Sequence, residues 1–183
     1  MYMHVKSKMM AFGGLSLALC ILFMALGSVF ETGTLFFLAA SSFFVGIMIR
    51  EMGMKMGLAF YLAAVLLGFI IAPNKFYVVT FGAMGLYILV IEGAWRLLAR
   101  NPGRFQKRGL FWGIKYLVFN VMYIPAALLF QELLFSRALT PVILAGVLLA
   151  GQVGLWIYDN AYEYTQAHIW SRMRGRLLRQ GES

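Results

Sequence analysis

The chain has 183 residues, of which 62% are hydrophobic and only 13% are charged, and its formal net charge is +9. A soluble domain usually has about 25% charged residues, so this chain has too little polar material to cover a soluble core. The composition excludes an ordinary soluble globular protein and indicates the bilayer as the solvent for the apolar excess. The length fits one compact helical domain over residues 1–183.

The positive charge is distributed in a way that argues against a nucleic-acid-binding protein. The sixteen Lys and Arg residues lie in short clusters between long apolar runs. Such clusters are typical of topology determinants, and their natural partners are the anionic headgroups of a lipid bilayer.

Six apolar runs follow one another along the chain, and none shows the period-2 alternation of a strand. Backbone groups in lipid must bond internally, so we expect six transmembrane helices in an all-α bundle. A span needs about 20 residues. The second and third runs are short by this measure, which predicts a tilted or broken helix or a locally thinned bilayer. The runs are residues 9–30, 35–49, 56–72, 76–98, 110–135 and 139–164.

The basic residues divide unequally between the two sides of the predicted bundle. Only Lys75 and Arg137 fall in the predicted outer loops, which leaves fourteen of the sixteen on the other side. The positive-inside rule therefore places both termini in the cytoplasm of a cell whose inner or plasma membrane holds the protein. Six spans also require both termini to lie on one side, so two independent signals agree.

The segment after the sixth run, residues 165–183, is predicted to be a basic cytoplasmic tail. Apolar residues such as Ile169, Trp170 and Leu177 alternate with arginines in it. This pattern is typical of an amphipathic helix lying on anionic lipid. A plain basic segment that stops translocation is the alternative.

Two pairs of charged residues lie within or beside the predicted spans. Glu92 lies inside the fourth run, where an acid is costly unless it is paired. Arg96 follows four residues later, so an intramembrane ion pair is expected and a role in conformational coupling is the alternative. Asp159 and Glu163 are also four apart and share one helical face near the inner interface. We interpret them as an interfacial pair facing the basic fourth loop, with a proton or cation site as the alternative.

Four polar residues are candidates for binding a small molecule. Asn120 lies in the fifth run, where a buried amide needs a partner on another helix, and it either bridges helices or lines a cavity. Tyr123 follows three residues later, and Pro125 can kink the same helix. Glu31 in the first outer turn and Gln131 at the outer end of the fifth run complete this set. For Glu31, the end of a hairpin in water is the alternative.

The sequence contains no motif of a known enzyme chemistry. A zinc-protease helix motif, a phosphate-binding glycine loop and a serine–histidine–acid combination are all missing. The single cysteine, Cys20, sits in an apolar run and is interpreted as a packing residue. His4 and His168 have no neighbour at metal-ligand spacing. We therefore expect no enzyme activity, no metal and no cofactor.

Small residues recur in the first run. Gly14 and Ala18 are four residues apart, the spacing that lets two membrane helices approach closely. This predicts that the first helix contacts another helix through these residues.

The layout of the chain resembles the substrate-binding S components of energy-coupling-factor transporters, together with uncharacterised small membrane proteins of Gram-positive bacteria. Six spans, two inner termini and short outer loops support the resemblance, which covers roughly residues 15–120. The segments that carry it are Leu15-Ser16-Leu17-Ala18-Leu19, Glu31-Thr32-Gly33-Thr34-Leu35, Ala40-Ser41-Ser42-Phe43-Phe44-Val45, Glu51-Met52-Gly53-Met54-Lys55-Met56-Gly57-Leu58, Pro73-Asn74-Lys75, Gly85-Leu86-Tyr87 with Glu92, and Lys115 through Phe119-Asn120.

The resemblance implies a subunit that captures a vitamin-like molecule or a metal near the outer side of the membrane. Such a subunit engages a transmembrane coupling protein that is driven by two ATPases. In that family, small residues of the first helix contact the coupling protein. Gly14 and Ala18 match this pattern in character, with glycine where alanine is usual.

A second interpretation comes from a different class of protein. Cell-shape scaffold subunits of the MreD type have a similar size, hydropathy and number of spans, and they organise cell-envelope proteins without transporting anything. In this interpretation the basic fourth loop and the arginine-rich tail are docking surfaces. A transporter predicts a polar or aromatic cavity between helices, whereas a scaffold predicts a tightly packed bundle.

The predicted topology can be tested with single cysteines placed at Thr34 and at Gly103 in a chain whose Cys20 is replaced by alanine. Thr34 belongs to the first outer turn and Gly103 to the basic fourth loop. We expect a membrane-impermeant thiol reagent to label the two positions from opposite sides of sealed vesicles. Labelling of both from the same side would contradict the topology.

Overall fold

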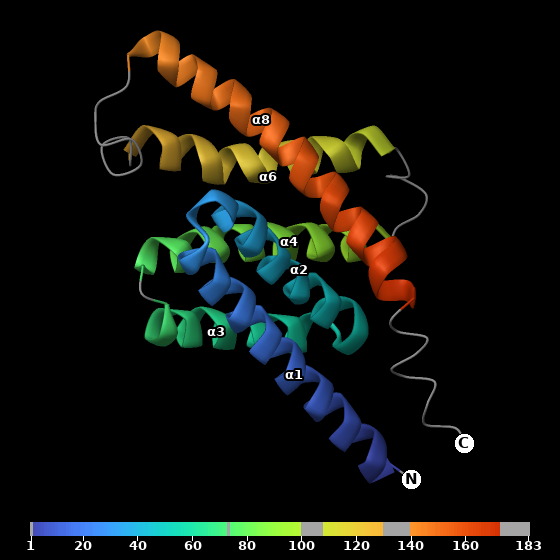
Figure 1. Ribbon diagram of the computed structural model, residues 1–183. Helices are drawn as coiled ribbons and strands as arrows, with labels where there is room; N and C mark the ends of the chain where they lie inside the picture. Colours follow the sequence, from blue (N-terminus) through green and yellow to red (C-terminus); the bar gives the residue numbers. More distant parts are fainter. Residues whose placement is uncertain (1, 73, 100–107, 130–139, 173–183) are drawn as a thin grey trace. The chain divides into compact units, whose positions relative to one another are not determined.

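The computed structural model describes the backbone of residues 2–72, 74–99, 108–129 and 140–172, and the side chains of residues 9–30, 32–72, 74–99, 109–128 and 140–172. Every regular element in these ranges is helical, which confirms the all-α prediction (Figure 1). Six of the helices are long and apolar enough to cross a membrane. The six predicted runs therefore all fall on candidate spans, and the side on which each end lies stays a prediction.

The chain divides into two compact units, an N-terminal unit of residues 1–105 and a C-terminal unit of residues 106–183. The helices of the N-terminal unit are α1 (Tyr2–Val29), the short 3-10 helix η1 (Glu31–Gly33), α2 (Thr34–Met52), α3 (Met54–Ile71) and α4 (Lys75–Ala99). The C-terminal unit contains α6 (Arg108–Leu129), α8 (Pro141–Tyr164) and the π-helix η2 (Thr165–Trp170). A single domain over the whole chain stays a prediction.

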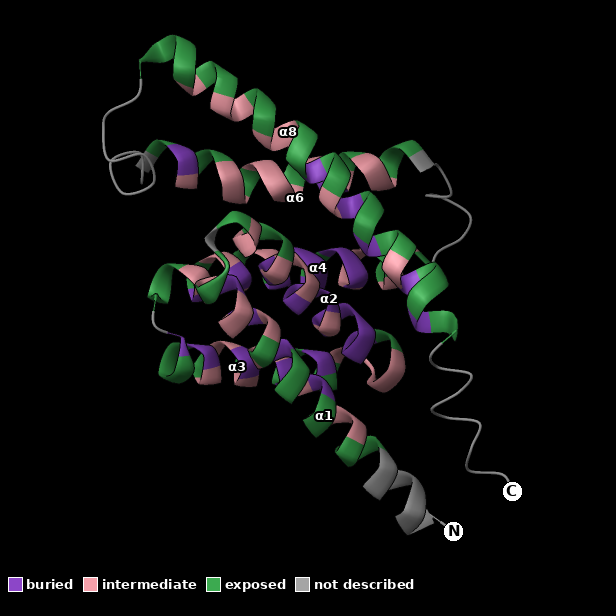
Figure 2. Cartoon of the chain, in the orientation of Figure 1, coloured by how far each residue is buried: buried purple, intermediate pink, exposed green. Residues whose placement is uncertain are grey.

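Helix α2 is the centre of the N-terminal unit, since it packs against α1, α3 and α4. Its residues from Ser41 to Ile49 are almost all buried, and Figure 2 shows buried residues gathered on α2 and α4. A helix that is apolar on all sides is expected to be surrounded by other helices. The outer faces of α1 and α3 keep large apolar side chains exposed, as helices in contact with lipid do. Among these are Leu15, Leu22, Leu62, Leu66 and Ile70.

The second and third runs form unbroken helices in the structure. The candidate spans are 19 residues in α2 and 18 residues in α3. At 1.5 Å per residue these helices are about 27–29 Å long, which is close to the ~30 Å hydrocarbon thickness. Of the three alternatives given for the short runs, a broken helix is therefore excluded, and a tilted helix or a locally thinned bilayer stays a prediction. The apolar runs underestimated the helices because α2 continues through Arg50 and Glu51 to Met52, and α3 begins at Met54, before Lys55.

Small residues allow the helices of the N-terminal unit to approach closely. A Cβ atom added at Gly85 would lie 2.8 Å from the ring of Tyr61, and one at Gly57 would lie 3.1 Å from the Cα of Ile49. Between α2 and α3 only one residue, Gly53, makes the turn, and its φ of +90° is a value that favours glycine. Cys20 is buried against Ser41 of α2, as expected of a packing residue.

The C-terminal unit consists of two packed helices, α6 and α8, and α8 continues into the π-helix η2. Helix α8 begins with Pro141, whose missing N–H costs nothing in the first turn of a helix. The helix predicted to continue beyond Tyr164 is present as far as Arg172. Residues 173–183, which hold most of the arginine-rich tail, lie outside the described residues, and so do residues 130–135 of the fifth run.

Candidate functional site

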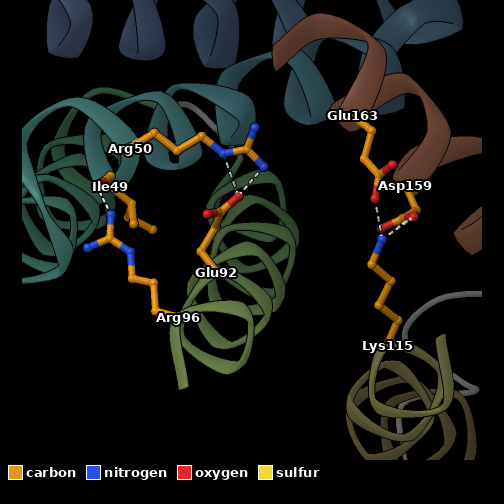
Figure 3. A network of polar contacts seen from close by, with 7 residues as sticks. All are labelled: Ile49, Arg50, Glu92, Arg96, Lys115, Asp159 and Glu163. Carbon is orange, nitrogen blue, oxygen red and sulfur yellow. Dashed lines mark hydrogen bonds and ion pairs between the residues drawn. The ribbon is translucent and has the colours of Figure 1, made fainter. Parts of the chain in front are cut away.

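Two clusters of charged side chains lie within the candidate spans, one in each unit (Figure 3). The Glu92 cluster consists of the Ile49 carbonyl, Arg50, Glu92 and Arg96. The second, here called the Lys115 cluster, consists of Lys115, Asp159 and Glu163. Charged side chains are rare in apolar spans and mark functional or structural contacts, because burying a charge in hydrocarbon is costly unless it is paired.

In the Glu92 cluster the buried carboxylate is paired across two helices. The side chain of Glu92 on α4 is only 5% exposed, and its Oε1 accepts from the Nε of Arg50 at 2.7 Å and from its Nη2 at 2.5 Å. Arg50 belongs to the last turn of α2, and its side chain is 41% exposed. This ion pair therefore ties the end of α2 to α4.

Arg96 does not make the ion pair that its spacing from Glu92 predicts. Its Nη2 instead donates to the backbone carbonyl of Ile49 at 2.5 Å. The Ile49 carbonyl already accepts the N–H of Gly53 at 3.0 Å, and a carbonyl oxygen has a second lone pair. In the last turn of α2 this lone pair is a natural acceptor for a guanidinium. The sequence predicted that Glu92 pairs with Arg96 on the same helix. Because α2 packs on α4, Glu92 pairs instead with Arg50 of α2. The adjacent residues Ile49 and Arg50 of α2 thus both bond to α4, Ile49 to Arg96 and Arg50 to Glu92.

In the Lys115 cluster a buried ammonium bridges two carboxylates on the neighbouring helix. The Nζ of Lys115 on α6 donates to Oδ2 of Asp159 at 2.7 Å and to Oε1 of Glu163 at 2.5 Å. The side chains of Lys115 and Asp159 are each 2% exposed, whereas that of Glu163 is 57% exposed. Asp159 and Glu163 therefore share one face of α8, as predicted. Both bond to Lys115, which flanks the basic fourth loop.

Aromatic rings complete the surroundings of the Lys115 ammonium. Its Nζ lies 4.6 Å from the ring centre of Phe111 and 5.1 Å from that of Trp112. A cation at this distance from the face of a ring is stabilised by the ring quadrupole. Sequence reasoning counted Lys115 only as a topology determinant. Its position inside the fifth apolar run was the signal that it is buried.

Asn120 bridges α6 and α8, which is one of the two roles predicted for it. Nε2 of Gln152 donates to Oδ1 of Asn120 at 2.7 Å, and Nδ2 of Asn120 lies 3.4 Å from the Gln152 amide oxygen. Tyr123 donates to the carbonyl of Val147 at 2.7 Å. A Cβ added at Gly151 would lie only 2.6 Å from the Tyr123 Oη, so any larger residue there would have to displace the Tyr123 ring. Sequence reasoning did not single out Gln152.

Glu31 belongs to η1, but its side chain lies outside the described part of the structure, and so does Gln131 entirely. Gly14 and Ala18 lie on an exposed face of α1. Of the four candidate ligand-binding residues, Asn120 and Tyr123 have described side chains, and both bond to α8. Within the described ranges no group of three His, Cys, Asp or Glu side chains could hold a metal ion.

Comparison with known proteins finds no matching family model, no matching curated protein and no matching solved structure. The class of the protein therefore follows from its own features. Six long apolar helices, with their buried charges paired between helices, indicate a multi-pass helical membrane protein.

The Lys115 cluster predicts a specific pattern of stability. Replacing Lys115 by methionine removes the ammonium that two carboxylates share, and breaking a buried ion pair costs about 3–5 kcal/mol. We expect the Lys115→Met variant to lose free energy of unfolding of that order in an SDS titration from mixed micelles. Adding Asp159→Asn should recover most of the loss.

Glu163→Gln is the matched control, because the Glu163 side chain is more than half exposed. An exposed pair contributes at most about 1 kcal/mol, so this variant should unfold close to the wild type. A Lys115→Met protein as stable as Glu163→Gln would show that the buried pair does not hold α6 to α8.

Proposed function

We propose that this chain is a membrane subunit that captures a small molecule and works through lateral contact with a transmembrane coupling protein, in the manner of S components. The observation that carries the proposal is the exposed small-residue face of α1. A Cβ added at Gly14 would meet nothing within 4 Å, and Ala18 is exposed four residues later. A partner helix can therefore come close to the α1 backbone here.

The opposite face of α1 holds the helix in the N-terminal unit. Ser16, Cys20 and Met24 are buried, and α1 packs on α2 and α3. Helix α1 thus has one face used for folding and one open face with small residues. Close approach of small residues is a main source of helix association in lipid, where apolar burial alone gives no preference for protein over lipid. This supports association with a membrane partner.

The capture of a small molecule is supported by polar groups inside the candidate spans of the C-terminal unit. Asn120, Gln152 and Tyr123 supply amide and hydroxyl groups between α6 and α8. A binding site in a helical bundle typically combines an apolar lining with a few placed polar groups of this kind. A vitamin-like molecule with hydrogen-bonding edges would suit these groups.

The second candidate function is a non-transporting scaffold of the MreD type. It is favoured by the fact that the same polar groups bond one another or the backbone, as in the Asn120–Gln152 pair. A scaffold needs such contacts only to hold its helices together. Both candidate functions involve binding another membrane protein, and they differ in which protein is bound.

The test is affinity purification of the tagged full chain from native membranes in mild detergent, followed by identification of the bound proteins. We expect a transmembrane coupling protein and two ATPases. A double variant, Gly14→Leu with Ala18→Leu, should lose this association about tenfold or more, since bulky residues keep a partner helix away.

Gly146→Leu on α8 is the matched control, because a Cβ at Gly146 also meets nothing within 4 Å. It should bind like the wild type. Recovery of cell-envelope proteins without the energising module would replace the transport proposal with the scaffold. Unchanged association of the Gly14 and Ala18 double variant would remove the proposed contact face.

A further inference from the structure

The buried carboxylate of Glu92 has two guanidinium groups within its reach. Arg50 reaches it from α2 and makes the observed ion pair. Arg96 stands four residues further along α4, where side chains of one helix are neighbours and carboxylate–arginine pairs form readily. In the structure Arg96 is turned away to the Ile49 carbonyl, next to Arg50 in the chain. One acceptor therefore has two alternative donors.

Burial separates the roles of the three side chains. Glu92 is 5% exposed and cannot turn to water, so it needs a cation in any state of the molecule. Arg50 is 41% exposed, and Arg96 is of intermediate exposure. A long arginine side chain can place its charged end at the headgroups while its stem stays along apolar surface. Arg50 and Arg96 can thus change partners, whereas the buried Glu92 carboxylate needs a cation at all times.

We propose that Arg50 and Arg96 exchange at Glu92, and that this exchange is a latch on the end of α2. In the latched state, seen in Figure 3, Arg50 holds Glu92 and Arg96 holds the Ile49 carbonyl. In the released state Arg96 turns back along α4 to Glu92, and Arg50 extends to the membrane surface. Both side-chain bonds between α2 and α4 in this cluster are then lost together.

Release keeps a partner on both acceptors of the cluster, Glu92 and the Ile49 carbonyl. Glu92 remains paired with a guanidinium in both states. The Ile49 carbonyl keeps the N–H of Gly53, which lies 3.0 Å away in the structure. Gly53 is also the single residue between α2 and α3, so a released α2 end adjoins a turn able to change its backbone angles. The latch is independent of the proposed function and would serve a transporter or a scaffold.

The chain contains its own reporter for the test. Cys20 is the single cysteine, it is buried, and it lies in the same unit as the latch. A thiol-reactive fluorogenic dye therefore reports thermal unfolding of this unit in the full-length protein in detergent. The variants to compare are Arg50→Gln, Arg96→Gln, both together, and both together with Glu92→Gln.

Exchange predicts a strongly non-additive result. Each single variant should lower the unfolding midpoint by only a few degrees, since the other arginine takes over Glu92. The double variant removes both of these guanidinium groups from the buried carboxylate and should lose about 10 °C or more. Adding Glu92→Gln should restore most of that loss. Failure of the double variant to fold, while the singles and the triple variant fold, supports the exchange equally.

A fixed ion pair predicts a different order of stability. Arg50→Gln alone would then show nearly the full loss of the double variant, or would not fold, and either result overturns the exchange. So does a double variant whose loss equals the sum of the two single losses. A double variant as stable as the singles, or one that Glu92→Gln does not rescue, would show that Glu92 does not need an arginine and also overturns it.

Discussion

The constraint on which this structure depends is that a charge inside an apolar helix must keep a partner. In hydrocarbon an unpaired carboxylate or ammonium is far more costly than in water. The chain meets this constraint between helices: Glu92 takes its cation from α2, and Lys115 takes two carboxylates from α8. Each charged pair thereby favours contact between two particular helices. Apolar surfaces alone give no such preference in lipid.

The two clusters differ in how firmly they are held. Lys115 and Asp159 are both buried, so neither can leave the other without exposing a charge to apolar surroundings. In the Glu92 cluster only the carboxylate is buried, and both arginines are partly or largely exposed. The first cluster is therefore suited to fixing a helix pair. The second combines a fixed acceptor with movable donors, which is the arrangement that a two-state contact needs.

Sequence reasoning predicted the helices well because hydropathy reports directly on the solvent around a segment. All six apolar runs fall on candidate spans, and even the short second and third runs are complete helices. It also predicted that Asn120 needs a partner on another helix. It failed to identify three partners: Gln152 for Asn120, Arg50 for Glu92 and Lys115 for Asp159. Only nearby spacing is visible in one chain, so Arg96 was preferred for Glu92, whereas the actual partner is 42 residues away.

The most direct test of this account is a solid-state NMR measurement on the protein in lipid bilayers. Asp159 is the only aspartate in the chain, so selective ¹³C labelling of aspartate carboxyls gives one signal. With ¹⁵N on the lysine ammonium groups, that signal should be strongly dephased by direct contact with Lys115 Nζ. The dephasing should vanish in the Lys115→Met variant. An aspartate signal without dephasing in the wild type would contradict the claim that buried charges pair between helices.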